Sequence, residues 1–292
     1  MQDNDNYRET FIKWITTSHV NNKEIIKNFL TKLDDFNLND YIGTDFNKIK
    51  VPTSPVILRN SKTFYGMEGR KQAEEEFLKT TLLSKSKEPI FFYSDLPITE
   101  AGQDEEFKQK WVLAMTMLLK KGLHLNIIHD IDRPINEMFL GLENWIPIYM
   151  TGSISPYYFK NPPSDLFLGC HCTSGSVALS SECMKNNEEN SRFYITTKKE
   201  ELKFYKEKSK YMLSNAKPLM TIFKENEKDK FEEFMKKEEN SDIRKVKKDT
   251  FKNIDFCINK NWILLNKKIS PEIHFVIYNY KLRNAIETFL ME

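Results

Sequence analysis

The chain has 292 residues, of which 40% are hydrophobic and 29% charged, so it can bury a sizeable core and is not a disordered polymer. Its 44 basic and 42 acidic residues nearly cancel, which argues against a dedicated nucleic-acid-binding domain with a large basic excess. Four cysteines are too few for a disulfide framework, and no apolar run approaches the ~20 residues that span a bilayer. Because the amino terminus is polar and acidic, unlike a signal peptide, we expect a cytoplasmic protein with no membrane contact.

Residues 1–50 are predicted to form a helical arm. Apolar side chains that include Phe11 and Trp14 recur there at helical spacing, and a second apolar stripe follows residue 21. We expect Phe11 and Trp14 to support a homodimer. The alternative is ordinary packing of the arm on its own chain.

Residues 51–224 are predicted to form an α/β domain around the unit at 89–152. Two short apolar runs, Ile90–Tyr93 and Leu123–His129, flank an apolar helix between them. A strand, helix and strand of this size pair in parallel with a right-handed connection. We therefore expect a mainly parallel central sheet with flanking helices, which binds ligands at the carboxyl ends of its strands.

The segment after His129 is predicted to be a helix that Asp132 caps and that Pro147 ends. Residues 154–195 have the pattern of several strands. Residues 225–292 are predicted to form a charged linker helix, then a β-hairpin around Asn259-Lys260-Asn261, a strand and a closing helix. We expect this C-terminal part to pack on the α/β domain.

Polar residues follow the predicted strands at their carboxyl ends. His124 and His129 are five apart, so a strand places them on opposite faces and only His129 leads into the polar run after it. The candidate ligand-binding residues are Asp95, His129, Asp132, Arg133 and Tyr157. Arg133 would pair with an anionic group of the ligand, and Asp95 or His129 would orient it. The alternative is that His129 packs locally and Asp132 only caps a helix.

The chain contains no complete catalytic or metal-binding motif. Cys170, His171 and Cys172 lack the two-residue gap of paired zinc ligands, and strand alternation puts both thiols on one face and the imidazole on the other. The segment Ser174-Gly175-Ser176 is not a Gly-x-Ser-x-Gly nucleophile elbow, and no dinucleotide-binding glycine motif or P-loop occurs. We therefore expect no metal, no cofactor and no catalysis.

The run KKGLHLNIIHDIDRPINEMFLGLENWIPIYMTGSISPYYF, at residues 120–159, resembles the C-terminal effector region of bacterial XRE-type helix-turn-helix transcription regulators. Residues 87–95 and 269–290 are similar to the same group. In that family a DNA-binding domain precedes this region, whereas residues 19–30 match a helix-turn-helix poorly. The resemblance implies a ligand-sensing, oligomerising region that responds to a small-molecule effector and reaches DNA only through a helix-turn-helix domain absent here.

The order of strands and helices also resembles phospholipase D-like folds. That chemistry requires His-x-Lys, and none of the five histidines has lysine two places on. The resemblance leaves two alternatives to a sensor: a degenerate phospholipase D-like hydrolase or nuclease, and an interaction module that pairs with full-length regulators.

Overall fold

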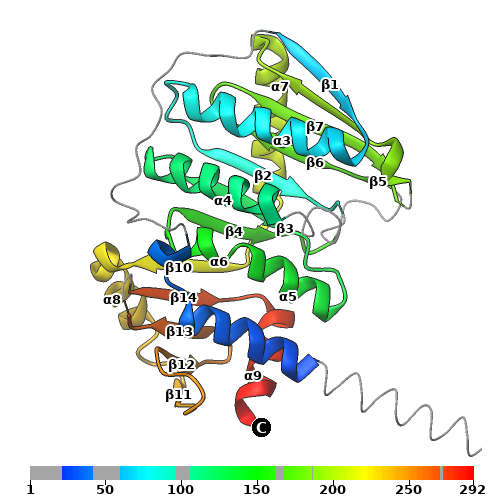
Figure 1. Cartoon of the computed structure of the whole chain (residues 1–292). Coiled ribbons are helices and arrows are strands. Elements are labelled where there is room, and N and C mark those ends of the chain that lie inside the picture. The colour runs from blue at the N-terminus through cyan, green and yellow to red at the C-terminus, as the bar shows by residue number, and fades with distance from the viewer. Residues whose placement is uncertain (1–21, 42–59, 97–104, 162–166, 186, 270–271) are drawn as a thin grey trace, which may run out of the picture.

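The computed structural model describes residues 22–41, 60–96, 105–161, 167–185, 187–269 and 272–292, and it shows a mixed α/β protein with two sheets (Figure 1). Phe11 and Trp14 lie outside the described residues. No helix within these ranges is long and apolar enough to cross a membrane.

The larger sheet is parallel only at its centre. Its order is β1 (Ser61–Tyr65), β8 (Arg192–Thr196), β7 (Ala178–Met184), β6 (Cys170–Thr173), β2 (Ile90–Ser94), β3 (Leu125–His129), β4 (Ile154–Tyr158) and β9 (Lys217–Pro218), with β5 (Phe167–Leu168) beside the end of β7. The parallel pairing of β2 with β3 confirms the predicted β-α-β unit, and β4 joins it in parallel. The other described pairs are antiparallel, so the expectation of a mainly parallel sheet is wrong. Strands β6, β7 and β8 follow one another through short connections, which join only antiparallel neighbours.

Helices cover both faces of this sheet. α3 (Gly66–Leu83) and α4 (Glu105–Lys120) lie on one face, and α7 (Lys199–Ser214) lies on the other (Figure 1). The crossover helix α4 ends one residue before a turn in which Gly122 has a φ of 87°, a conformation that glycine adopts without strain.

The helix predicted after β3 is two helices. α5 (Ile135–Asn144) ends before Trp145, and α6 (Ile146–Tyr149) follows directly. Pro147 lies in the first turn of α6, where its missing N–H is not needed, so it begins a helix and does not end one. Asp132 is exposed, and the residue that precedes α5 is Pro134, so the predicted Asp132 cap is absent.

The second sheet is wholly antiparallel. Its order is β10 (Met220–Lys224), β14 (Ile273–Ile277), β13 (Ile263–Lys267), β12 (Ile254–Ile258) and β11 (Arg244–Val246). Ile258 pairs with Ile263, which confirms the predicted hairpin around residues 259–261. β10 belongs to this sheet although it precedes the boundary predicted at 224/225. The division into domains stays a prediction.

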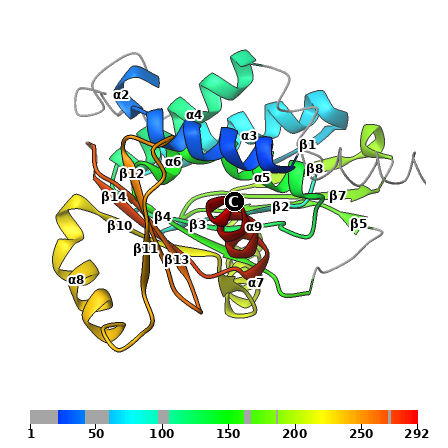
Figure 2. The same ribbon diagram turned by 90° about the horizontal axis from the view of Figure 1, so that it is seen from below.

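The two faces of the second sheet pack against different helices. Alternate residues such as Phe256, Leu265 and Phe275 face the main core, which includes the helix at 22–35 and α9 (Tyr280–Met291). Their neighbours Cys257, Leu264 and Val276 face α8 (Lys228–Lys237), on the other side of the sheet (Figure 2). The segment predicted as a charged linker therefore includes a helix with one apolar face. The short elements are α2 (Leu38–Tyr41), η3 (Glu188–Asn190) and η4 (Glu225–Glu227).

Candidate functional site

A cavity of about 170 Å³ lies at the carboxyl ends of β2 and β3. Residues of helices α3, α4 and α5, which lie on one face of the sheet, form its other walls. The walls are mainly apolar. The side chains that form these walls include Phe92, Phe107, Trp111, Ile127, Leu142 and Trp145. Ligand pockets of open α/β sheets lie at this edge.

Three aromatic rings hold one another in place in the wall. The ring centroids of Trp111 and Trp145 are 5.0 Å apart and the rings are perpendicular. Phe92 lies edge-on to both, at 6.0 Å from Trp111 and 5.6 Å from Trp145. Because edge-to-face contacts fix ring orientation, this part of the wall has a defined shape.

His129 ends β3 and faces the cavity. Its Nε2 shares a hydrogen bond of 2.7 Å with the Tyr149 hydroxyl, and its ring lies 5.6 Å from that of Trp145. Burial lowers the pKa of His129 to about 3 and raises the pKa of Tyr149. Both groups are therefore neutral at physiological pH.

The charged groups of the cavity occur in pairs. On α3, Arg70 Nε donates to Glu74 Oε1 at 3.0 Å, and both side chains are buried. Arg133 Nε donates to Asp130 Oδ2 at 2.7 Å, and its Nη2 donates to a backbone carbonyl at 3.2 Å. Each guanidinium thus already has a carboxylate partner, so an anionic ligand would have to compete with one.

The hydroxyl of Ser94 lacks a partner. Ser94 is the last residue of β2 and lines the cavity. Its Oγ is buried and makes no hydrogen bond within the described part of the chain. An unsatisfied buried hydroxyl costs about 1–3 kcal/mol, which a polar atom of a ligand would recover.

The structure brings two of the five predicted residues to this cavity. His129 and Arg133 line it. Asp132 is exposed, and Tyr157 packs on the opposite face of the sheet beside α7. Asp95 accepts hydrogen bonds from other protein groups and is not among the lining residues. A ligand-binding role for the five stays a prediction.

Asp95 joins β2 to the segment before β6. Its carboxylate accepts from the Tyr93 hydroxyl at 2.7 Å and from the Gly169 amide at 2.6 Å. Burial raises the pKa of Asp95, although both of these hydrogen bonds oppose that shift. These contacts make it a structural group that fixes the edge of the site.

The sequence pattern missed the side chains that helices supply. Arg70 and Glu74 are four apart on α3, a spacing that signals an ion pair but not its burial. Trp111 and Trp145 lie in predicted helices, and only the packing of these helices brings the rings together. The sequence indicates no role for Ser94 beyond its place at the end of a predicted strand.

The cysteines around His171 are structural. Cys170 and Cys172 face the main core, whereas His171 Nε2 lies 3.0 Å from Ser209 Oγ and 3.1 Å from the Tyr205 carbonyl on α7, which confirms the predicted alternation. Burial lowers the pKa of His171 to about 4. Among the described residues there is no group of three or more His, Cys, Asp or Glu that could hold a metal ion.

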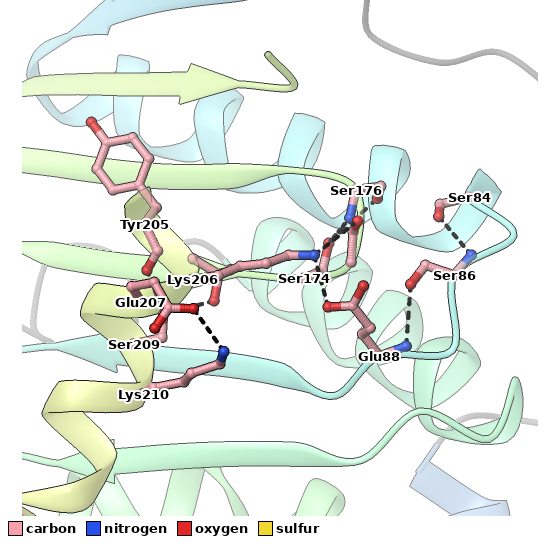
Figure 3. A network of polar contacts seen from close by, with 12 residues as sticks. Ser84, Ser86, Glu88, Ser174, Ser176, Tyr205, Lys206, Glu207, Ser209 and Lys210 are labelled. Carbon is pink, nitrogen blue, oxygen red and sulfur yellow. Dashed lines mark hydrogen bonds and ion pairs between the residues drawn. The ribbon is translucent and has the colours of Figure 1, made fainter. Parts of the chain in front are cut away.

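A polar network lies between α7 and the loops at the other end of β2 (Figure 3). Lys206 Nζ donates to Glu88 Oε2 at 2.7 Å and to the Gly175 carbonyl at 3.3 Å. Ser174 Oγ accepts from Thr81 Oγ1 at 3.0 Å. Lys206 thus forms an ion pair with Glu88, and the contacts of Lys206 attach α7 to the sheet.

No family model and no curated protein matches the chain. Among solved structures, similar ones include TrmBL2, an archaeal chromatin protein with a novel mode of DNA binding (10% identity, 56% of each chain, TM-score 0.39). A second is NucT from Helicobacter pylori, at 12% identity and a TM-score of 0.36, where the match covers 54% of this chain and 98% of NucT. A third is the phospholipase D family member Nuc from Salmonella typhimurium, at 13% identity and a TM-score of 0.36, where the match covers 54% of this chain and 96% of Nuc. This chain spans 56% of the length of TrmBL2. Likenesses of this strength identify no family and assign no function.

Proposed function

We propose that this chain binds a small, mainly apolar molecule in the cavity at the ends of β2 and β3 and serves as the ligand-sensing, oligomerising effector region of a transcription regulator. The observation that carries the proposal is the buried hydroxyl of Ser94, which has no partner among the described residues and belongs to a residue that lines an aromatic cavity whose charges are already paired. Such a site fits a neutral ligand with one hydrogen-bonding group better than the anionic ligand expected from Arg133.

The size of the cavity limits the ligand. An apolar cavity of about 150 Å³ holds one benzene ring, and this one measures about 170 Å³. A single aromatic ring with one hydroxyl or N–H group would fill it, with the ring against Trp111 and Trp145 and the polar atom at Ser94.

Helix α5, which lines the cavity, also contacts the N-terminal arm through other side chains. Phe139 of α5 packs edge-on against Phe29, on the helix at 22–35, at a centroid distance of 5.3 Å. Lys32 and Glu143 form an ion pair between the same helices. A ligand that favours one position of α5 would therefore bias the arm, and a homodimer through that arm would transmit the bias. DNA recognition is left to a helix-turn-helix domain, as the family resemblance implies.

The first test is native mass spectrometry of the freshly purified chain, followed by calorimetric titration with p-cresol and indole. We expect a small bound mass that is lost on denaturation, or saturable binding of one of the two probes. Ser94→Ala should weaken binding roughly tenfold, because one net hydrogen bond is worth about 1 kcal/mol or slightly more.

Thr116→Val is the matched control, since Thr116 Oγ1 is also buried with no partner among the described residues but does not line the cavity. This variant should bind as the parent does. An empty chain that binds neither probe, or equal losses in the two variants, would contradict the proposal.

The alternative function is a degenerate phospholipase D-like hydrolase or nuclease, the activity class to which the names of two similar structures point. It requires a nucleophile, and His129 is the candidate at this site. Hydrolysis of DNA or of a chromogenic phosphodiester that His129→Ala abolishes without unfolding would favour this alternative. Co-purification with an intact regulator would instead favour an interaction module.

A further inference from the structure

A second cavity, of about 260 Å³, lies where the two sheets meet. Its walls come from the residue before β3, from β4 and the turn before it, and from β9, β10 and η4. The polar side chains that line it in the described part of the chain are those of His124, Ser155, Tyr157, Thr221, Lys224 and Glu227, so Tyr157, predicted to bind a ligand, lies at this cavity and not at the first. It opens at the end of β3 opposite His129, and the function proposed above does not use it.

We propose that this seam cavity binds a small oxyanion, either a phosphate or a carboxylate group. Two nitrogen-bearing side chains reach it from different sheets. His124 Nε2 lies 2.8 Å from Ser155 Oγ, and Lys224 Nζ donates to Ser153 Oγ at 3.0 Å. An ammonium, an imidazole and hydroxyls together are the donor set that phosphates and carboxylates require.

The Lys224 ammonium has no direct ion pair among the described residues, although the Glu227 carboxylate is near enough to feel its charge. In the described part of the chain, the one acidic residue that lines the cavity is Glu227, which accepts from Lys230 Nζ at 2.7 Å and from the backbone N–H of Lys224 at 3.4 Å. Among the described residues, no carboxylate forms an ion pair with the Lys224 ammonium. This is the opposite of the first cavity, where each cation has its own carboxylate.

The backbone is shaped to let Lys224 reach the cavity. Gly152 has a φ of 62°, and a Cβ at this position would overlap the aliphatic part of the Lys224 side chain. Glycine alone adopts this conformation freely and leaves the space open. The lysine therefore runs across the turn before β4 and ends beside Ser153, with its charge held at the seam.

An anion at this position must change the titration of His124. The charged groups that face His124 are Lys224 from β10 and Glu227 from η4. Burial, and then the positive charge of Lys224, lower the pKa of His124, and Glu227 opposes this. A bound oxyanion adds negative charge, so it should raise that pKa, and binding should strengthen as the pH falls through it.

The experiment follows the histidine ring resonances of the whole chain by NMR during titration with sodium phosphate, and separately with sodium acetate, at constant ionic strength. We expect a saturable shift of His124 and a rise of its pKa by roughly half a unit or more. A response to phosphate alone, to acetate alone or to both supports the site and distinguishes the two sources of oxyanion. A lack of any saturable response to either would overturn the proposal.

Variants localise the response. Lys224→Met should weaken binding at least tenfold, and Lys224→Arg should retain it because the charge remains. Lys228→Met removes an exposed cation on α8 that pairs with Glu232, so it should behave as the parent does. An equal response in Lys224→Met and in the parent, with both folded, would show that the anion does not bind at the seam.

Discussion

The two cavities lie at opposite ends of β3, and they differ in whether their cationic side chains form ion pairs with carboxylates. At the carboxyl end, Arg70 and Arg133 are each paired with a carboxylate, and aromatic rings fill the wall. At the other end, the Lys224 ammonium donates to the Ser153 hydroxyl, and the His124 imidazole lines the same cavity. The difference teaches that a buried arginine does not by itself indicate an anion site. The pairing of the cation decides which ligand can bind.

Removal of the aromatic wall should have the largest effect. Trp145→Ala deletes edge-to-face contacts with Trp111 and Phe92 and leaves a void, so we expect a loss of about 3 kcal/mol in the free energy of unfolding. Urea unfolding measures this loss. Binding of p-cresol should disappear while the response of His124 to phosphate persists. If a folded variant loses both p-cresol binding and the His124 response to phosphate, the two cavities are coupled and are not separate sites.

Acid should destabilise the chain through the half-buried His129 and the buried His171. The pKa values of His129 and His171 are lowered to about 3 and about 4, below the unfolded value near 6.5, so the unfolded state binds more protons. Stability is therefore complete above the unfolded pKa and declines as the pH falls, by about 2 kcal/mol between roughly pH 6.5 and 5.5 for the pair. His129→Gln should roughly halve this slope in urea titrations, and an unchanged slope would contradict the burial of His129.

Loss of the Tyr149 hydroxyl should have a smaller effect. Tyr149→Phe removes the hydrogen-bond partner of His129 Nε2 and should cost about 1–2 kcal/mol, because the buried nitrogen is left unsatisfied. Thermal unfolding compares this variant with Tyr211→Phe, whose side chain is 73% exposed and should have no effect. Equal stabilities of the two variants would show that the His129 contact contributes nothing.

The smallest effect is expected at the α7 network. Lys206→Met breaks the partly exposed ion pair with Glu88 (Figure 3) and should cost about 0.5 kcal/mol. Neither p-cresol binding nor the phosphate response of His124 should change, which calorimetry and NMR would verify. A change in either one would connect α7 to a cavity that it does not line.

Sequence patterns predicted the elements whose signal is local. The hairpin at 259–261 and the alternation at 170–172 depend on patterns within a few residues, and the parallel pair β2 and β3 depends on one strand-helix-strand unit of continuous chain. The antiparallel remainder of the sheet depends on which strands become neighbours, and β10 joins the second sheet although it directly follows β9 of the first. Periodicity within one strand carries no information of this kind.

The site was harder to predict than the fold. Asp95 stands where a ligand group is expected, but its partner Gly169 is 74 residues away and no local pattern reveals it. The same holds for Arg133, whose neutralisation by Asp130 depends on the turn geometry after β3. No sequence pattern indicates a role for Lys224, because an isolated lysine at the end of a strand has no recognisable motif. Only the fold places it between the two sheets.

The most direct test of the account is one NMR experiment on the whole chain that observes the tryptophan indole and histidine ring signals while p-cresol and phosphate are added separately. We expect p-cresol to shift the indole signals of Trp111 and Trp145 and to leave the His124 signals unchanged, whereas phosphate should shift the His124 signals and leave both indole signals unchanged. If p-cresol leaves both indoles unshifted, or if phosphate moves them, the division between an apolar sensing cavity and a separate anion site is wrong.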